Sequence, residues 1–128
     1  MSPLRTASPY LLTALLAGAA ATHFLKPGYY DPIVPHLLPG PARFWTYLSG
    51  AAELGVAAAV GIPRTRRLGA LAAAGLFVAV FPANLQMALD AHTTGSRIVT
   101  YARLPLQLPL IWWALKTAQW SRRSDSVA

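Results

Sequence analysis

Four long apolar stretches restrict this chain to very few folds. They cover about residues 9–25, 44–62, 68–89 and 104–120. Each contains about 17 to 22 residues, enough for an α-helix to cross the hydrocarbon core of a bilayer. None has the alternating pattern of a β-strand, and in lipid a helix satisfies every backbone hydrogen bond within one segment. We therefore expect an all-α protein, an integral membrane four-helix bundle that forms one domain over residues 1–128.

The small share of charged residues excludes an ordinary soluble enzyme. Only 12% of the residues are charged and 55% are hydrophobic, whereas about a quarter are charged in a typical soluble domain. The chain has no cysteine, which excludes disulfides, thiolate metal sites and cysteine nucleophiles. The net charge of +7 comes from basic residues beside the apolar stretches, where they anchor membrane helices. We expect the lipid bilayer as a partner and no nucleic acid.

The connections between the apolar stretches carry unequal numbers of Lys and Arg. Loops on the cytoplasmic side of a membrane protein are enriched in both residues. The N-terminus, the second connection and the C-terminal end hold seven, whereas the first and third connections hold four. We therefore expect a multi-pass protein with both termini in the cytoplasm. The seven are Arg5, Arg64, Arg66, Arg67, Lys116, Arg122 and Arg123, and the four are Lys26, Arg43, Arg97 and Arg103.

The first apolar stretch has a second interpretation. Arg5, the apolar run from Leu11 and the small residues 19–21 together resemble a secretory signal with a cleavage site. The apolar run continues through Phe24 and Leu25, further than a signal peptide needs. We therefore expect this stretch to remain as the first membrane helix.

The first connection, residues 26–43, is rich in proline. It holds five of the eleven prolines, so no long helix can form there. Its apolar residues recur at the spacing of a helical turn. We expect this segment to lie in the membrane interface as a lid over the outer end of the bundle.

Polar side chains within the apolar stretches lie toward the outer side. A charged acidic side chain at mid-membrane costs about 3 kcal/mol on the insertion scale, so we expect Glu53 to face the bundle interior. Small and polar residues recur around it at three- and four-residue spacing. The pattern predicts either a polar pocket open to the outside or a hydrogen-bond cluster that fixes helix register and binds nothing. The expected pocket residues are His23, Glu53, Asn84 and Gln107, with Lys26, Asp90 and Arg103 at the rim.

Metal-binding and catalytic motifs are missing from the sequence. The three histidines, His23, His36 and His92, are far apart and form no spacing typical of a metal site. No glycine-rich phosphate loop and no Ser–His–acid set can be recognised. We therefore expect no metal site and no catalytic residue.

The polar positions resemble those of the DoxX-like family of small bacterial four-helix integral membrane proteins. The resemblance covers about residues 10–120 and depends on the order and spacing of several short motifs. These are His23-Phe24 with Lys26-Pro27, Tyr30-Asp31 with Ile33-Val34-Pro35, Tyr47 to Leu54, Pro63 to Arg67, Phe81-Pro82-Ala83-Asn84, and Arg103-Leu104-Pro105-Leu106-Gln107.

That resemblance implies a bacterial plasma-membrane bundle in which the first helix is retained. The family is named for a subunit of a quinone-linked oxidoreductase, and some members are associated with membrane redox complexes and oxidative-stress defence. Its characteristic polar positions correspond to His23, Glu53, Asn84, Arg103 and Gln107 here, with no catalytic role attached to them.

Three functional hypotheses follow. In the first, the protein is a non-catalytic accessory subunit of a membrane oxidoreductase, with no intrinsic cofactor, whose outer pocket holds a quinone or a lipid. In the second, it is a small transporter or lipid-handling protein that can act as a homo-oligomer, with Glu53 as a proton site. In the third, it is a scaffold without a ligand.

Overall fold

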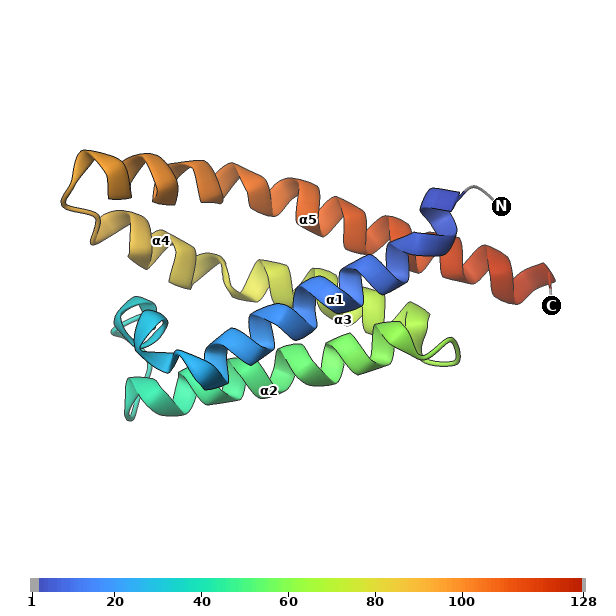
Figure 1. The fold of residues 1–128 in the computed structure, drawn as a ribbon, viewed down its shortest axis with the longest axis horizontal. Helices are drawn as coiled ribbons and strands as arrows, with labels where there is room; N and C mark the ends of the chain where they lie inside the picture. The colour runs from blue at the N-terminus through green and yellow to red at the C-terminus, as the bar shows by residue number, and fades with distance from the viewer. Residues whose placement is uncertain (1–2, 128) are drawn as a thin grey trace.

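The computed structural model describes the backbone of residues 3–127 and the side chains of residues 3–121 (Figure 1). Over these residues the chain is all-helical with no strand, which confirms the expected all-α class. Arg122 and Arg123, counted above for orientation, lie outside the described side chains. The elements are α1 (Pro3–Leu25), the 3-10 helices η1 (Pro27–Tyr29) and η2 (Asp31–Ile33), α2 (Ala42–Gly61), α3 (Arg66–Ala79), α4 (Phe81–Leu89) and α5 (Thr94–Val127).

The expected count of four helices is wrong, because the stretch 68–89 forms two helices. Val80 is at once the C-cap of α3 and the N-cap of α4. Pro82 lies in the first turn of α4, where its missing N–H is tolerated, although it would interrupt a continuous helix. By contrast, α5 passes through both of its prolines without a break, and it begins about ten residues earlier than expected.

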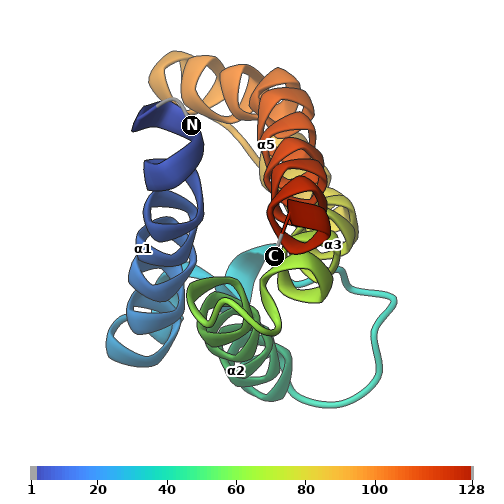
Figure 2. The same ribbon diagram turned by 90° about the vertical axis from the view of Figure 1, so that its right-hand side faces the viewer.

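The helices form a bundle that is closed at one end and open at the other. Helix α1 packs along α2, α2 along α3, and α3 along α5. Helices α1 and α5 meet near the chain termini and diverge toward η1, η2 and the α4–α5 connection (Figure 1). In the view from the termini, α2 lies below α1, and α3 lies beside α5 (Figure 2). We call the two ends the closed end and the open end.

A buried polar network ties α1 to α5 at the closed end. The Trp113 indole donates to Ser8 Oγ over 2.7 Å, and Ser8 Oγ is 2.8 Å from Thr117 Oγ1. The Thr117 hydroxyl donates to the Trp113 carbonyl, so Ser8 is the donor in its bond to Thr117. Sequence analysis did not predict a polar cluster at this end. Toward the middle of the bundle, Leu12, Leu16 and Val60 are almost fully buried and extend the tightly packed part of the bundle away from the closed end.

Two glycines let α2 approach its neighbours closely. A Cβ atom on Gly69 would lie 2.6 Å from the backbone nitrogen of Val60, so only glycine fits where α3 crosses α2. A Cβ atom on Gly50 would lie 2.9 Å from the Cβ atom of His23, where α2 meets α1. These contacts fix the positions of the three helices around the residues described next.

Much of the apolar surface is exposed. Two helical stretches of the described chain are long and apolar enough to cross a membrane, judged by length and composition: Pro3–Leu25, and Arg66–Leu89, which joins α3 and α4. Only 33% and 28% of their most apolar windows are buried inside the bundle. Other large apolar side chains that face outward are Leu54 of α2 and Leu108 of α5.

Candidate functional site

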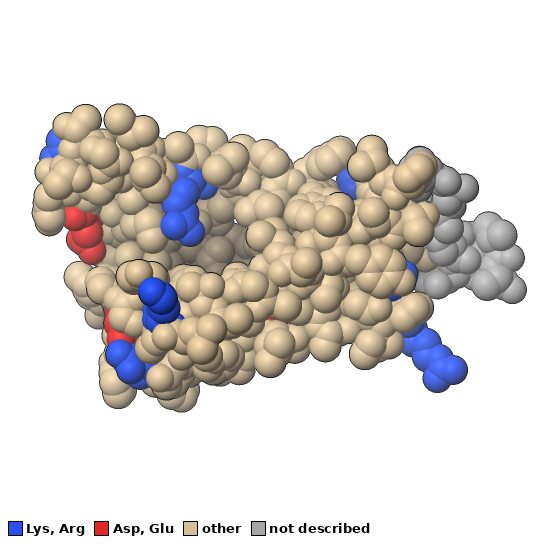
Figure 3. Space-filling model, viewed as in Figure 1, with Lys and Arg blue, Asp and Glu red and all other residues tan. Residues whose placement is uncertain are grey.

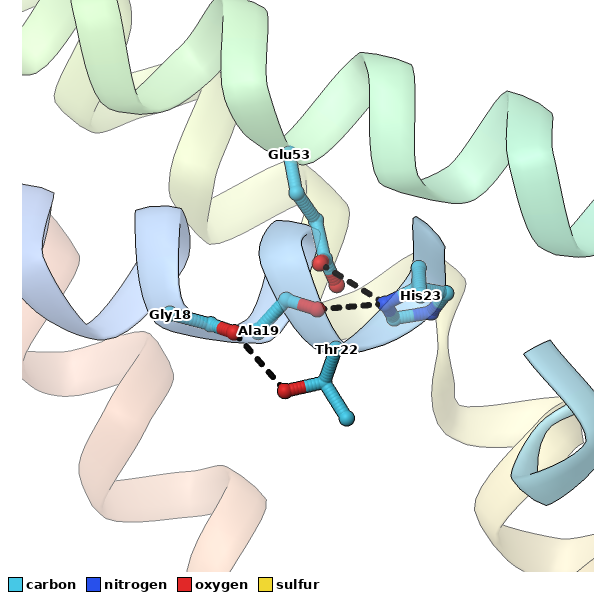
Figure 4. A network of polar contacts seen from close by, with 5 residues as sticks. All are labelled: Gly18, Ala19, Thr22, His23 and Glu53. Atoms are coloured by element: carbon cyan, nitrogen blue, oxygen red, sulfur yellow. Dashed lines mark hydrogen bonds and ion pairs between the residues drawn. The ribbon is translucent and has the colours of Figure 1, made fainter. Parts of the chain in front are cut away.

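A buried histidine and a buried glutamate face each other between α1 and α2 (Figure 4). His23 lies in the last turn of α1, which ends at Leu25 because Pro27 disfavours helical geometry at the residue before it. Glu53 lies one turn beyond Gly50, whose lack of a Cβ atom lets α2 approach α1 at His23. Each residue is 7% exposed, and His23 Nδ1 is 3.2 Å from Glu53 Oε2. The structure thus brings together two residues that the sequence predicted as pocket residues.

The Glu53 oxygen that faces His23 receives no hydrogen bond. His23 Nδ1 is 2.7 Å from the Ala19 carbonyl, and because a carbonyl only accepts, the Nδ1 hydrogen points to Ala19. The contact with Glu53 Oε2 is therefore electrostatic at most. Among the described residues this oxygen is buried without a hydrogen-bond partner. A buried polar atom left unpaired costs about 1–3 kcal/mol, so this oxygen is a candidate binding atom.

Gln107 also presents a buried oxygen without a partner. The side chain is 5% exposed, and its Nε2 donates to the Phe77 carbonyl. Phe77 lies near the end of α3, where helix carbonyls lose their own donors. That bond fixes the orientation of the amide, because only the nitrogen can donate to a carbonyl. Oε1 is therefore an acceptor, and within the described structure it is buried with no hydrogen-bond partner.

The other residues expected in the pocket or at its rim form no hydrogen bond with His23, Glu53 or Gln107 among the described side chains. Asn84 is half-buried in α4, and none of the hydrogen bonds seen among the described side chains links it to His23, Glu53 or Gln107. At the expected rim, Lys26 lies over the Tyr29 ring, exposed Asp90 accepts from Gln86, and Arg103 points to the sulfur of Met87.

Tyr30 is a site residue that the sequence reasoning missed. Its ring stacks on the His23 ring with centroids 3.7 Å apart and planes 12° from parallel. Burial is the main reason that the pKa of Tyr30 is raised. A hydrogen bond with Thr22 lowers it, the charge of Glu53 raises it, and the charge of Arg103 lowers it. Tyr30 therefore covers His23 from the side of the proline-rich segment. The only feature of the sequence that could have indicated this role is the position of the tyrosine next to an aspartate in that segment.

A carboxylate fastens the proline-rich segment to α2. Asp31 Oδ1 accepts from Thr46 Oγ1 over 2.7 Å, and Asp31 Oδ2 accepts from Arg43 at 2.8 Å. Thr46 is 1% exposed. Helix η2, which begins at Asp31, lies against both α2 and α4. The segment thus closes over part of the open end, and Arg43, one of the four basic residues of the first and third connections, has a structural role.

The Asp31 contact predicts a response to acid. The Thr46 hydrogen bond, and then Arg43, hold the pKa of Asp31 below its ordinary value of 3.8. Because the folded pKa is depressed, the stabilisation is complete above 3.8 and is lost as the pH falls through the folded value. In Thr46→Val we expect the titration midpoint of the Asp31 carboxyl, followed by carbon-13 NMR, to rise toward 3.8. Equal midpoints in the two proteins would show that Thr46 does not hold the carboxylate.

The open end is hollowed in the space-filling view (Figure 3). The hollow lies between the α4–α5 side and the α1–α2 side, and Lys or Arg side chains lie on both of its rims. Glu53 and Gln107 come from helices on opposite sides of the bundle, α2 and α5. The hollow, with basic residues on both rims, is a candidate mouth for a pocket.

Comparison with known proteins identifies a family but no function. Residues 12–118 match the model of a family described as "Domain of unknown function (DUF8561)". No curated protein and no solved structure matches the chain.

Proposed function

Because this chain belongs to the DUF8561 family, whose function is unknown, we propose its function from its own geometry. The protein is a non-catalytic bacterial plasma-membrane component that holds a quinone or a similar amphipathic molecule for a partner oxidoreductase. The observation that carries this proposal is the buried Glu53 oxygen that faces His23 without a hydrogen-bond donor. Under this proposal Glu53 binds the head group, His23 and Tyr30 shape its surroundings, and the proline-rich segment covers the mouth.

The exposed apolar surface supports insertion in a membrane. The core helix of a soluble protein buries most of its apolar residues, whereas here only 33% and 28% of the two most apolar windows are buried inside the bundle. Lipid is the solvent for such a surface. We propose four crossings, formed by α1, α2, the joined pair α3–α4, and α5. The resemblance to DoxX-like proteins supports the same topology and the link to quinone chemistry.

The closed end favours holding a ligand over transporting it. A transporter needs access to its site from both sides of the membrane. Here Leu12, Leu16 and Val60 are packed beyond the site, and the Ser8–Trp113–Thr117 network joins α1 to α5 behind them. A scaffold without ligand would leave the oxygens of Glu53 and Gln107 unpaired at a cost in stability. The one-sided pocket therefore supports the holding role best.

Cysteine labelling tests the proposed orientation. The chain has no native cysteine, so His36→Cys and Thr65→Cys each introduce a single exposed thiol. In intact cells we expect a membrane-impermeant maleimide to label position 36 and to leave position 65 unlabelled until the membrane is opened. The reverse pattern would place the open end in the cytoplasm and would contradict access from outside.

Mass spectrometry of the protein in nanodiscs from its native membrane tests the function. We expect a quinone-type molecule or a redox subunit to be recovered in stoichiometric amounts, and the same spectra give the oligomeric state. Recovery of bulk lipid alone would contradict the holding role and favour a scaffold.

A further inference from the structure

The cationic side chains at the closed end of the bundle have no acidic neighbours. The acidic residues among the described side chains are Asp31 and Asp90 at the open end and Glu53, which faces His23 in the last turn of α1. The ion pairs seen among these side chains therefore lie away from the closed end. Figure 3 agrees, because the closed end shows Lys and Arg but no Asp or Glu on its visible, described surface. The cations at this end are Arg5, Arg64, Arg66, Arg67 and Lys116.

Some of these cations are fixed beside aromatic rings of a neighbouring helix. The Arg66 guanidinium of α3 lies 5.2 Å from the centre of the Tyr10 ring of α1, and that of Arg5 of α1 lies 5.5 Å from the Trp120 ring of α5. Arg66 also donates to the last carbonyls of α2, so it holds the α2–α3 connection together. Basic and aromatic side chains gather in this way where membrane helices meet the lipid head groups. The closed end thus has the composition of a membrane interface.

Arg64 and Arg67 have no such contacts. Both side chains are exposed, and among the described residues neither makes a hydrogen bond, an ion pair or a ring contact. Arg64 lies in the connection between α2 and α3, and Arg67 lies in the first turn of α3. Thr65, between them, donates to the Ala59 carbonyl over 2.8 Å and holds the connection against the end of α2. This short turn therefore presents two guanidinium groups that have no partner within the described chain.

Exposed apolar side chains flank the two arginines. Ile62, before Arg64, is 52% exposed, and Leu68, after Arg67, is 72% exposed. A soluble acidic partner would meet the arginines but would need apolar surface of its own to cover these two side chains. A lipid surface meets both kinds at once, because apolar side chains enter the hydrocarbon boundary while guanidinium groups stay at the phosphates. The order of apolar, basic and apolar residues along this turn therefore favours lipid over a soluble acidic partner.

We propose that the closed end is a docking surface for anionic phospholipids, whose phosphate groups are bound by Arg64 and Arg67. This inference rests on the membrane location in the proposed function and is independent of the molecule held in the pocket. A zwitterionic head group carries its own cation beside the phosphate, so it gains little from another. An anionic head group leaves the phosphate charge uncompensated, and basic side chains near an anionic surface are attracted to it. The two arginines thus select lipids by their net charge.

Native mass spectrometry of the full chain from nanodiscs made of equal parts of phosphatidylglycerol and phosphatidylcholine tests this surface. The readout is the ratio of the two lipids that stay bound to the protein, relative to their ratio in the nanodisc. For the wild type we expect phosphatidylglycerol to be enriched about fivefold or more. Arg64→Gln and Arg67→Gln should each lower that enrichment by about fivefold, the factor that one arginine near an anionic surface contributes.

Arg97→Gln is the matched control. It removes one cation from an exposed position near the open end of α5, where Asp90 remains, so we expect its enrichment to stay close to that of the wild type. Circular dichroism checks that all variants keep their helical content. Equal losses in the three variants, or no enrichment in the wild type, would overturn the inference and leave the membrane location standing. A chain that does not float with vesicles of either lipid would contradict the membrane location itself.

Discussion

Glu53→Gln is expected to fold normally and to lose the bound ligand. The substitution keeps the size of the side chain but replaces the carboxylate with a neutral amide. A hydrogen bond to a charged group contributes about 1.5–3 kcal/mol, so retention of the co-purifying molecule should fall about tenfold to a hundredfold. Mass spectrometry of wild-type and variant protein in nanodiscs measures the loss. Full retention by a folded variant would show that Glu53 is not the centre of the site.

The polar network at the closed end provides a control for Glu53→Gln, because a change there should affect stability but not ligand retention. Thr117 belongs to the closed-end network and is 1% exposed. Thr117→Val removes the acceptor of Ser8 and should destabilise the bundle by about 1–2 kcal/mol, with no effect on ligand retention. Opposite outcomes for the two variants would distinguish a polar group that binds from one that only stabilises. Loss of ligand in both would indicate that the pocket depends on overall rigidity.

Gly69→Ala is expected to cause the largest loss of stability. The added Cβ atom would lie 2.6 Å from the Val60 nitrogen and 2.7 Å from the Ala59 carbonyl carbon. Both are backbone atoms, so no side chain can turn aside and α3 must move away from α2. Overpacking of this kind costs about 1–3 kcal/mol, and a rigid backbone contact favours the upper end. Denaturation followed by circular dichroism measures the change.

Gly75→Ala on the same helix is the matched comparison. Nothing lies within 4 Å of a Cβ atom built on Gly75, and alanine favours a helix interior over glycine by about 0.5–1 kcal/mol. We therefore expect this variant to be as stable as the wild type or slightly more so. Equal destabilisation by both substitutions would mean that helix α3 does not pack on α2 through Gly69.

The sequence predicted the helices better than their ends. Apolar length is enough to recognise α1 and α2, but α1 begins at Pro3, six residues before the expected start, and contains Pro9 in its interior. A proline in an apolar stretch, by contrast, is compatible with a kink or a break. Pro82 lies at a break between two helices, where Gln107 donates to the free carbonyl of Phe77. Because these two residues are distant in sequence, local patterns do not predict the break. Pro105 lies inside a continuous helix.

The start of α5 was predictable in principle. Thr93 accepts from the backbone N–H of Ser96, and the Ser96 hydroxyl accepts from the N–H of Thr93. This reciprocal pattern is a capping box with serine in place of glutamate. The expected fourth stretch, by contrast, begins only at residue 104, where the apolar run starts. Local capping chemistry therefore decides this boundary, and hydropathy does not detect it.

The site was predicted in part. Helical depth grouped His23 with Glu53, and the structure places them in contact. It grouped Gln107 with them as well, but depth alone did not reveal the bond to Phe77. The roles of Tyr30 and Asp31 depend on how the proline-rich segment folds back over α1 and α2. The helical spacing of the apolar residues in that segment does not reveal which of its polar side chains contact α1 and α2.

The divergence of α1 and α5 gives the bundle the shape of a wedge. In a bilayer, a wedge occupies more area in one leaflet than in the other. Under the proposed membrane location, lateral pressure in the wider leaflet would push α1 and α5 together. The closed end, where Ser8 bonds Thr117, would act as the hinge, and the width of the opening would depend on the surrounding lipid.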